Sequence, residues 1–284
     1  MATVKAVRFN KATIPAFFIL IFWAVLSAIP IFWMLIAAFT PSTLLLQVPP
    51  KISVNNFGIE NFQRLFSQRT LQDQIYIGKW FLNSLFVAGV VTIFNVFFDM
   101  LAGFAFARRK FPGRDVLFVM LMSSIIIPGS VTLIPLFSLI IHLHLYNSLW
   151  GVILPSISSP VGIFLMRQYI RTLPDSLEDA AKLDGASEFQ IFYKIILPLS
   201  KPIMAVWAIF VFMGTWNSFL WPLIVLNDPS KYTLQVGLAS FQTKYTTDYG
   251  LTMAGTALSA VPMVIFFLLF QKYLNEGINI GSIQ

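Results

Sequence analysis

The sequence predicts an all-α integral membrane protein with six transmembrane helices and a cytoplasmic hairpin of two short helices between spans four and five. Of its 284 residues, 57% are hydrophobic and only 11% are charged, and the mean hydropathy is +0.77. Soluble domains carry about a quarter charged residues, so membrane lipid is the expected surroundings. The net charge of +7 gathers in short clusters beside apolar runs, which is typical of topology signals and not of a nucleic-acid interface.

Six apolar stretches are long enough to cross a bilayer, whose hydrocarbon core of about 30 Å takes roughly 20 helical residues. We place the spans near residues 14–39, 80–107, 116–141, 148–166, 203–226 and 252–274, and we treat residues 1–284 as a single transmembrane domain. Prolines inside most of these runs predict kinked helices that pack on one another. The first run follows three basic residues, as a signal peptide does. It is longer than a signal peptide's apolar core and has no small-residue cleavage site, so we expect a retained span.

The distribution of Lys and Arg predicts which side of the membrane each loop faces. With an even number of spans, both termini lie on one side. That side, with the loops 108–114 and 167–202, carries most of the 19 Lys and Arg residues. Short loops rich in these residues stay in the cytoplasm. Both termini and the loop that holds the hairpin are therefore predicted to be cytoplasmic.

The first helix of the hairpin, which as a whole covers residues 175–198, is well delimited by its end residues. Asp175 is the expected N-cap, with Glu178 three residues later as in a capping box, and Gly185 supplies the left-handed residue that ends the helix. Glu178 also precedes Lys182 by four residues, an order that favours an ion pair along a helix.

The second helix of the hairpin is predicted to open on a capping box made by Ser187 and Gln190 and to end at Pro198. Small residues in the first helix and at the corner, namely Ala180, Ala181, Gly185 and Ala186, would let the hairpin approach another backbone closely. Composition leaves two alternatives open: the hairpin packs on the spans of its own chain, or it lies against the surface of another protein.

Residue types that carry chemistry are sparse in this chain. It has no Cys, which excludes disulfides, thiolate nucleophiles and cysteine metal sites. It also lacks G-x-x-x-x-G-K-[ST], H-E-x-x-H and G-x-S-x-G, the motifs of P-loop ATPases, zinc hydrolases and serine hydrolases. His142 and His144 would point in different directions on a helix, so a shared metal is not expected. We therefore predict that the chain is not an enzyme and has no catalytic residue, cofactor or metal site.

The hairpin also carries a sequence motif. The stretch "DAAKLDG", followed after nine residues by "IILP", fits the pattern E-A-A, three residues, G, nine residues, I-x-L-P. In this the chain resembles the permease subunits of binding-protein-dependent ABC importers. Asp179 stands where the family usually has Glu, with Glu178 beside it, and the remaining spacing is complete.

Further stretches narrow the resemblance and extend it over nearly the whole chain. These stretches are "IPIFWML", "AFARRKFPGR", "MSSIIIPGSVTLIPLF", "GTWNSFLWPLIVLNDPSKYTLQVGLASFQ" and "FFLLFQKYL". They resemble carbohydrate-uptake permeases of the maltose type, and among these the smaller, six-span partner. The resemblance implies a multi-pass protein of the cytoplasmic (inner) membrane of a bacterium or archaeon. The C-terminal "NEGINIGSIQ" departs from the family's common ending.

The resemblance implies that the chain is half of a heterodimeric pore. Its partners would be a second permease subunit, two ABC ATPase subunits and an extracytoplasmic sugar-binding protein. The binding protein would deliver a sugar or oligosaccharide, and the spans would import it by alternating access driven by the ATPase. The hairpin is then the coupling helix pair, seated in a cleft of the ATPase, where Asp179 or Glu178 pairs with a basic residue. The residues implied in this coupling contact are Glu178, Asp179, Ala180, Ala181, Asp184, Gly185 and Ala186.

Two further sets of residues are expected to meet binding protein and substrate. The resemblance implies that part of the external loop reaches into the binding protein, unless it only caps the outer mouth: Gln242, Thr243, Lys244, Tyr245, Thr246 and Thr247. Sugars are bound by aromatic faces and by amide hydrogen bonds. The pathway candidates of these types, which have structural roles between helices or at the interface as their alternative, are Asn95, Trp216, Asn217 and Trp221.

Asp99 is a further pathway candidate, since it is the acid predicted to lie well inside a span. A carboxylate there costs about 2.5–3.5 kcal/mol on insertion scales. Either it lines the translocation cavity, or it lies near enough to the cytoplasm to be solvated or paired with Arg108 and Arg109. We favour the second. A rival function, an ion-coupled secondary transporter with Asp99 as its proton or sodium site, leaves the hairpin motif unexplained, and the last three spans do not repeat the first three.

Overall fold

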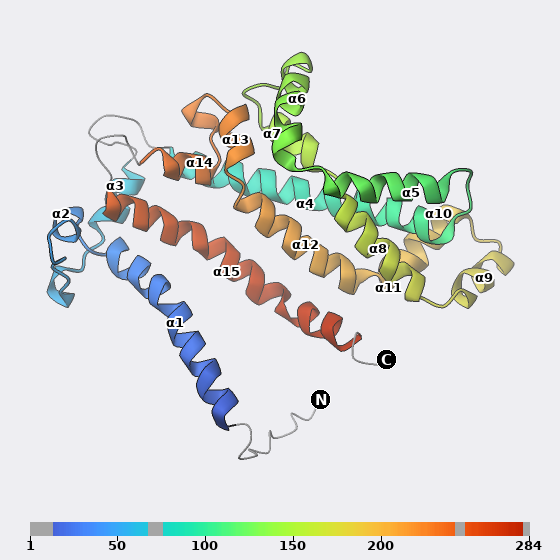
Figure 1. Cartoon of the computed structure of the whole chain (residues 1–284), viewed down its shortest axis with the longest axis horizontal. Helices are drawn as coiled ribbons and strands as arrows, with labels where there is room; N and C mark the ends of the chain where they lie inside the picture. The colour runs from blue at the N-terminus through green and yellow to red at the C-terminus, as the bar shows by residue number, and fades with distance from the viewer. Residues whose placement is uncertain (1–13, 68–75, 242–247, 281–284) are drawn as a thin grey trace. The chain divides into compact units, whose positions relative to one another are not determined.

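All regular secondary structure in the described part of the chain is helical. The computed structural model describes residues 14–67, 76–241 and 248–280, and within these ranges it contains no strand (Figure 1). The predicted all-α fold class is thereby confirmed. By its internal contacts the chain divides into two compact units, one made of residues 1–75 and 241–258 and the other of residues 76–240 and 259–284.

The smaller unit contains the first helix of the chain and the start of the last. Its elements are α1 (Ile14–Ala38), α2 (Ser42–Leu45), the 3-10 turn η2 (Val54–Asn56), α3 (Glu60–Phe66) and the first turns of α15 (Tyr249–Ile280). Ala38, Ala254 and Ala257 form its small core, because short side chains let α1 and α15 approach closely. The buried amide of Asn61 donates hydrogen bonds to the carbonyls of Ala38 (3.0 Å) and Thr40 (2.9 Å).

Asp248 caps the start of α15. Its carboxylate accepts hydrogen bonds from Ser42 Oγ (2.6 Å) and from the backbone N–H of Leu251 (3.0 Å), and it forms an ion pair with Arg64. Burial raises the pKa of Asp248, but the hydrogen bonds from Ser42, Leu251 and Arg64 together outweigh burial and hold the pKa below its usual value. The carboxylate is therefore charged at neutral pH and fixes the first turn of the helix.

The larger unit is built around α4 (Ile77–Arg108), a helix of 32 residues with one buried side. Helices α8 (Pro160–Thr172) and α12 (Lys201–Trp216) pack along it (Figure 1). The other elements are α5 (Arg114–Ser123), η3 (Ser124–Ile126), α6 (Gly129–His142), α7 (Leu149–Ile153), η4 (Leu154–Ser156), α9 (Ser176–Leu183), α10 (Glu188–Ile191), η5 (Phe192–Ile196), α11 (Leu197–Leu199), α13 (Leu220–Val225), η6 (Pro229–Lys231) and α14 (Leu234–Ala239). One apolar cluster of this unit surrounds Met100 and Met166 and reaches the hairpin at Ile191 and Ile196.

Three helices of the described residues are long and apolar enough to cross a membrane, namely α1, α4 and residues Tyr249–Leu269 of α15. Three bent pairs pass the same test when joined: Arg114–Ile126 with Gly129–His142 (bend 104°), Leu149–Ser156 with Pro160–Thr172 (41°), and Glu188–Leu199 with Lys201–Trp216 (74°). If each pair is one span, the total is six. The count of six spans stays a prediction.

The helix predicted over residues 203–226 is interrupted. α12 ends at Trp216, and the separate helix α13 begins at Leu220. In a continuous helix the ring of Pro222 would clash with the carbonyl of Ser218, whereas in the first turn of α13 its missing N–H costs nothing. The apolar segment joined to α12 in the bent pair is instead Glu188–Leu199, on its N-terminal side.

Candidate functional site

The corner of the hairpin is built as its sequence predicts. α9 ends at Leu183, and Gly185 follows with a φ of +78°, the left-handed conformation that glycine adopts without strain. Ser187 Oγ accepts a hydrogen bond from the backbone N–H of Gln190 (3.3 Å), and Gln190 Oε1 accepts one from the N–H of Ser187 (2.8 Å). The glycine end and the capping box are both confirmed.

Two expectations for the ends of the hairpin helices are wrong. Asp175 makes no capping hydrogen bond to α9, because its carboxylate pairs with Arg108 instead. Pro198 does not end the second helix, which continues to Leu199. A π-helical turn, Phe192–Ile196, precedes this proline and widens the helix just before the ring, so the usual clash with the preceding turn is relieved.

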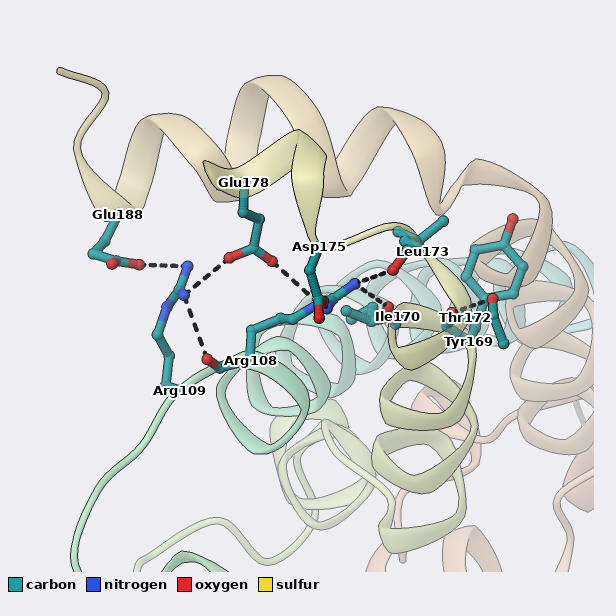
Figure 2. A network of polar contacts seen from close by, with 9 residues as sticks. All are labelled: Arg108, Arg109, Tyr169, Ile170, Thr172, Leu173, Asp175, Glu178 and Glu188. Atoms are coloured by element: carbon teal, nitrogen blue, oxygen red, sulfur yellow. Dashed lines mark hydrogen bonds and ion pairs between the residues drawn. The ribbon is translucent and has the colours of Figure 1, made fainter. Parts of the chain in front are cut away.

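Glu178 is the centre of an ion-pair network that joins the hairpin to the end of α4 (Figure 2). Its side chain is buried, with 4% of the residue exposed. Glu178 Oε1 lies 3.1 Å from Arg108 Nε, and Oε2 lies 3.0 Å from Arg109 Nη1. Each arginine also pairs with a second acid, Asp175 for Arg108 and Glu188 for Arg109. Two guanidinium groups thus compensate one buried carboxylate, which would be costly to bury alone.

The same network reaches the C-terminal end of α8. Arg108 Nη2 donates hydrogen bonds to the carbonyls of Ile170 (2.8 Å) and Leu173, where a cation is favoured by the helix dipole. The ion pair expected between Glu178 and Lys182 is absent from the described residues, because Glu178 faces the arginines and Lys182 is exposed. Arg108 therefore connects three elements: α4, α8 and the hairpin.

The outer face of the hairpin is exposed and combines acids with large apolar side chains. Asp179, Ala180, Asp184 and Gly185 are exposed, Ala186 is half-buried and Ala181 is buried beside Glu178. Leu183 is 89% exposed and Phe189 is 71% exposed. Phe189 stacks on the exposed ring of Tyr193, with ring centroids 6.2 Å apart. Apolar rings that are exposed together, as Phe189 and Tyr193 are, are typical of a surface that another protein covers.

A hollow of about 360 Å³ lies at the corner of the hairpin. It is lined by Asp184, Gly185, Ala186, Gln190, Lys194 and Ile195. Apart from its two neighbours in the chain, no described residue has an atom within 4 Å of a Cβ added to Gly185. Among the described residues, the corner is therefore open on this side.

Asp99 is held by the broken span that contains α8. It has no exposed surface, and its Oδ1 accepts hydrogen bonds from Ser158 Oγ (2.8 Å) and from the backbone N–H of Ser159 (2.9 Å). Its Oδ2 accepts a hydrogen bond from Trp207 Nε1 (3.0 Å). The favoured expectation of a solvated carboxylate, or one paired with Arg108 and Arg109, is wrong, because neutral donors surround the group.

Two other pathway candidates, Asn95 and Trp216, have buried side chains. Asn95 is buried and bridges Ser156 and Trp207, donating to the first (2.9 Å) and accepting from the second (2.8 Å). Trp216 is buried and donates to the carbonyl of Ser259 (3.1 Å). The structure thus brings Asn95 and Asp99 together through Trp207 and leaves Trp216 in separate contacts.

The last two pathway candidates are open to solvent or lipid to different degrees. Asn217 is exposed and donates to the carbonyl of Met213 (2.9 Å), and Trp221 is half-buried and donates to the carbonyl of Gly151 (3.3 Å). The six residues expected to contact a binding protein, Gln242 to Thr247, lie outside the described residues.

Sequence reasoning missed three residues of these networks: Arg108 and Arg109 as partners of the hairpin, and Trp207 as a donor inside the membrane. For the arginines, the signal was a pair of cations at the end of the second predicted span, on the side where the acidic hairpin is expected. For Trp207, it was an indole inside the predicted span 203–226, because a buried tryptophan needs an acceptor for its N–H.

Comparisons with known proteins match this chain to membrane components of transport systems. Residues 99–280 match the family described as binding-protein-dependent transport system inner membrane component. The arabinooligosaccharides transport system permease protein AraQ of Bacillus subtilis is 38% identical over 90% of this chain and 90% of the relative. The lactose transport system permease protein LacG of Rhizobium radiobacter is 31% identical over 92% of each chain.

The fold is similar to that of a solved transporter. The crystal structure of a bacterial ABC transporter involved in the import of the acidic polysaccharide alginate contains a chain that superposes with a TM-score of 0.82. The match covers 94% of this chain and 99% of that one at 20% sequence identity. At that identity the likeness is one of fold.

Proposed function

The chain belongs to the binding-protein-dependent transport system inner membrane components, and we propose that it is the permease subunit of an ATP-driven importer of oligosaccharides. The sequence contains no phosphate-binding loop, so the energy comes from two separate ATPase subunits. A second permease completes the pore, and an extracytoplasmic binding protein delivers the sugar. Six spans with both termini in the cytoplasm alternate between outward-facing and inward-facing states.

The observation that carries this proposal is the two-sided hairpin. Its inner face is bound to α4 through Glu178, whereas its outer face presents Asp179, Leu183 and Phe189 to the cytoplasm. We assign the outer face to the ATPase contact, with the exposed Asp179 as the acid that pairs with a basic residue of the ATPase. The ATPase would contact the hairpin closely at four further positions: Ala180, Asp184, Gly185 and Ala186. The buried residues Glu178 and Ala181 would hold the hairpin against its own chain.

The substrate is proposed to be an oligosaccharide because relatives at similar coverage are named for arabinooligosaccharides, lactose and diacetylchitobiose. Asn217 and Trp221 offer an amide and an aromatic face to it. Asn95, Asp99 and Trp216 are buried in this state, so they would reach the pathway only in another state of the cycle. Arabinooligosaccharides are the first probe to use in uptake measurements.

The coupling role is tested by replacing Gly185 with Glu and measuring uptake of a labelled arabinooligosaccharide by cells that express the full transporter. The Glu side chain would project from the exposed corner into the ATPase seat, so uptake is expected to be abolished while membrane insertion is retained. Gly113→Glu is the matched control. Gly113 also has a left-handed φ, +77°, and its Cβ would likewise meet nothing within 4 Å, so it carries the same backbone strain at another loop. Retained uptake in Gly185→Glu would contradict the coupling assignment.

The rival function, an ion-coupled secondary transporter that uses Asp99, finds no support in the family to which the chain belongs. The partners of Asp99 are the start of α8 and an indole N–H, which suit a fixed structural contact. An uncoupler added at constant ATP separates the two functions, because it would collapse ion-driven uptake and leave ATP-driven uptake intact.

A further inference from the structure

A hairpin seated on an ATPase moves substrate only if its displacement reaches the membrane spans. We propose that Arg108, Arg109 and Glu178 clamp the hairpin to a lever made of α4 and α8, and that polar contacts at both ends of α8 pin this lever together. These are positioning residues, and the inference rests on the coupling role proposed above for the hairpin.

The first pin lies at the start of α8, inside the membrane. Asp99 of α4 accepts hydrogen bonds from Ser158 Oγ and from the N–H of Ser159, directly before Pro160 opens the helix. It binds the N–H of the N-cap residue Ser159, the donor that the N3 side chain binds in a capping box, and this acceptor is supplied here by a different helix. The break in the Leu149–Ser156 and Pro160–Thr172 pair, bent by 41°, is thereby fastened to α4.

The second pin lies at the other end of α8. Arg108, nine residues after Asp99 on α4, donates to the carbonyls of Ile170 and Leu173. At about 1.5 Å per residue this places the two pins roughly 13 Å apart along α4. The two helices run in the same direction, since the earlier residue of α4 meets the start of α8 and the later residue meets its end. Sliding or rotating one helix on the other would break both pins.

Between the pins the two helices are in close contact. A Cβ atom added at Gly103 of α4 would overlap Met166 of α8, and one added at Gly162 of α8 would overlap Asp99 and Trp207. Glycines that let backbones approach this closely are typical of fixed helix pairs in membranes. A close-packed pair pinned at both ends transmits displacement as one body, because packed interiors deform little.

The clamp itself is the pair of arginines on Glu178. The hairpin is held to the lever by one buried carboxylate shared between two guanidinium groups, at 3.1 Å and 3.0 Å. The neighbouring acid, Asp179, is exposed and points about 100° away from Glu178 around the helix axis. Adjacent acids of α9 thus have separate tasks: Asp179 faces the motor, and Glu178 passes the motion on to α4 and α8.

The test compares Glu178→Gln with Asp179→Asn in the complete transporter, purified through a tag on this chain and reconstituted with its binding protein. Three quantities are measured: the amount of ATPase subunit retained, the rate of ATP hydrolysis, and the uptake of labelled arabinooligosaccharide. Glu178→Gln keeps the size of the side chain and removes the charge that the two arginines share. We expect it to retain the ATPase and its hydrolysis, while uptake per ATP falls about tenfold, in the range of coupling energies between sites.

Asp179→Asn is expected to act differently. It should release ATPase subunits from the complex, so that hydrolysis and uptake fall together and uptake per ATP of the remaining complex is unchanged. The clamp is overturned if Glu178→Gln leaves uptake per ATP at the wild-type value, or if it releases the ATPase as Asp179→Asn does. A wild-type preparation that contains no ATPase at all would instead sink the proposed function.

A second variant keeps the test decisive if Glu178→Gln lowers the yield of protein. Arg109→Lys preserves the positive charge but not the fork that reaches both Glu178 and Glu188. Uptake per ATP is expected to fall about threefold with normal amounts of assembled complex. An unchanged ratio in this variant would also contradict the clamp.

Discussion

Asp99 and Glu178 are both carboxylates with almost no exposed surface, yet Asp99 is held by neutral donors and Glu178 by two arginines. Asp99 lies within a span, where a second charge would add its own insertion cost. Glu178 lies in the hairpin between α8 and α12, where arginine side chains reach it from the end of α4. Burial alone therefore does not define the role of an acid. The contact of Asp99 depends on the geometry of the start of α8, and that of Glu178 depends on charge.

The largest effect is expected from replacing Asp99 by Leu. This variant leaves the backbone N–H of Ser159 without its acceptor, at about 1–3 kcal/mol for an unsatisfied donor. The indole N–H of Trp207 loses one of its two acceptors and keeps Asn95 Oδ1. Asp99→Asn keeps one carbonyl oxygen for the start of α8 and should lose clearly less. Thermal unfolding of the purified protein in detergent measures both.

The control for this pair is Asp115→Leu, which removes an exposed acid from α5 and should change the free energy of unfolding by about 0.5 kcal/mol or less. If Asp99→Leu were as stable as the control, the contact with α8 would contribute nothing. If Asp99→Asn were as damaging as Asp99→Leu, the charge and not the geometry of the acceptor would be what matters.

A smaller, local effect is expected from Arg109→Gln, which removes one of the two cations on Glu178. The buried carboxylate is then left with Arg108, and the backbone amides of α9 should exchange hydrogen roughly tenfold faster, since exchange reports local opening. Lys182→Gln is the matched control, because Lys182 is exposed on the same helix outside the network. Equal exchange in both variants would show that Arg109 does not hold the hairpin.

The smallest effect concerns Asp248, a third carboxylate whose donors are mixed: a hydroxyl, a backbone N–H and Arg64. Its pKa is lowered in the folded protein, so its contribution to stability is present above the usual value of about 3.9. The contribution is lost as pH falls from there through the folded pKa. After correction for the pH dependence of the intrinsic rate, amides in the first turn of α15 should exchange roughly threefold faster below that value than above it. Asp248→Asn should abolish this pH step; a step that persists would assign it to another group.

Local features of the candidate site could be predicted from the sequence, whereas the residues that contact its buried acids could not. Gly185 and the Ser187–Gln190 capping box involve residues at most three positions apart, and the structure contains both. Caps depend on backbone conformation over a single turn, which neighbouring residues determine. The all-α class likewise follows from composition and the length of the apolar runs.

The partners of the two buried acids come from far along the chain. Glu178 meets Arg109 across 69 positions, and Asp99 meets Trp207 across 108. Sequence reasoning matched each acid with the cation nearest in sequence, Lys182 for Glu178 and the α4 arginines for Asp99, and tertiary packing overrode both choices. The break after Trp216 was missed for a related reason, because a proline inside an apolar run can either kink a helix or start a new one.

The most direct test of the account is to purify the tagged chain from its native membrane in mild detergent and to identify by mass spectrometry the proteins that accompany it. We expect a P-loop ATPase and a second permease in the purified complex, and we expect the amount of ATPase to fall, with the second permease retained, when Gly185 is replaced by Glu. Recovery of the chain alone, repeated across several detergents, would contradict the assignment of the hairpin as the seat of an ATPase.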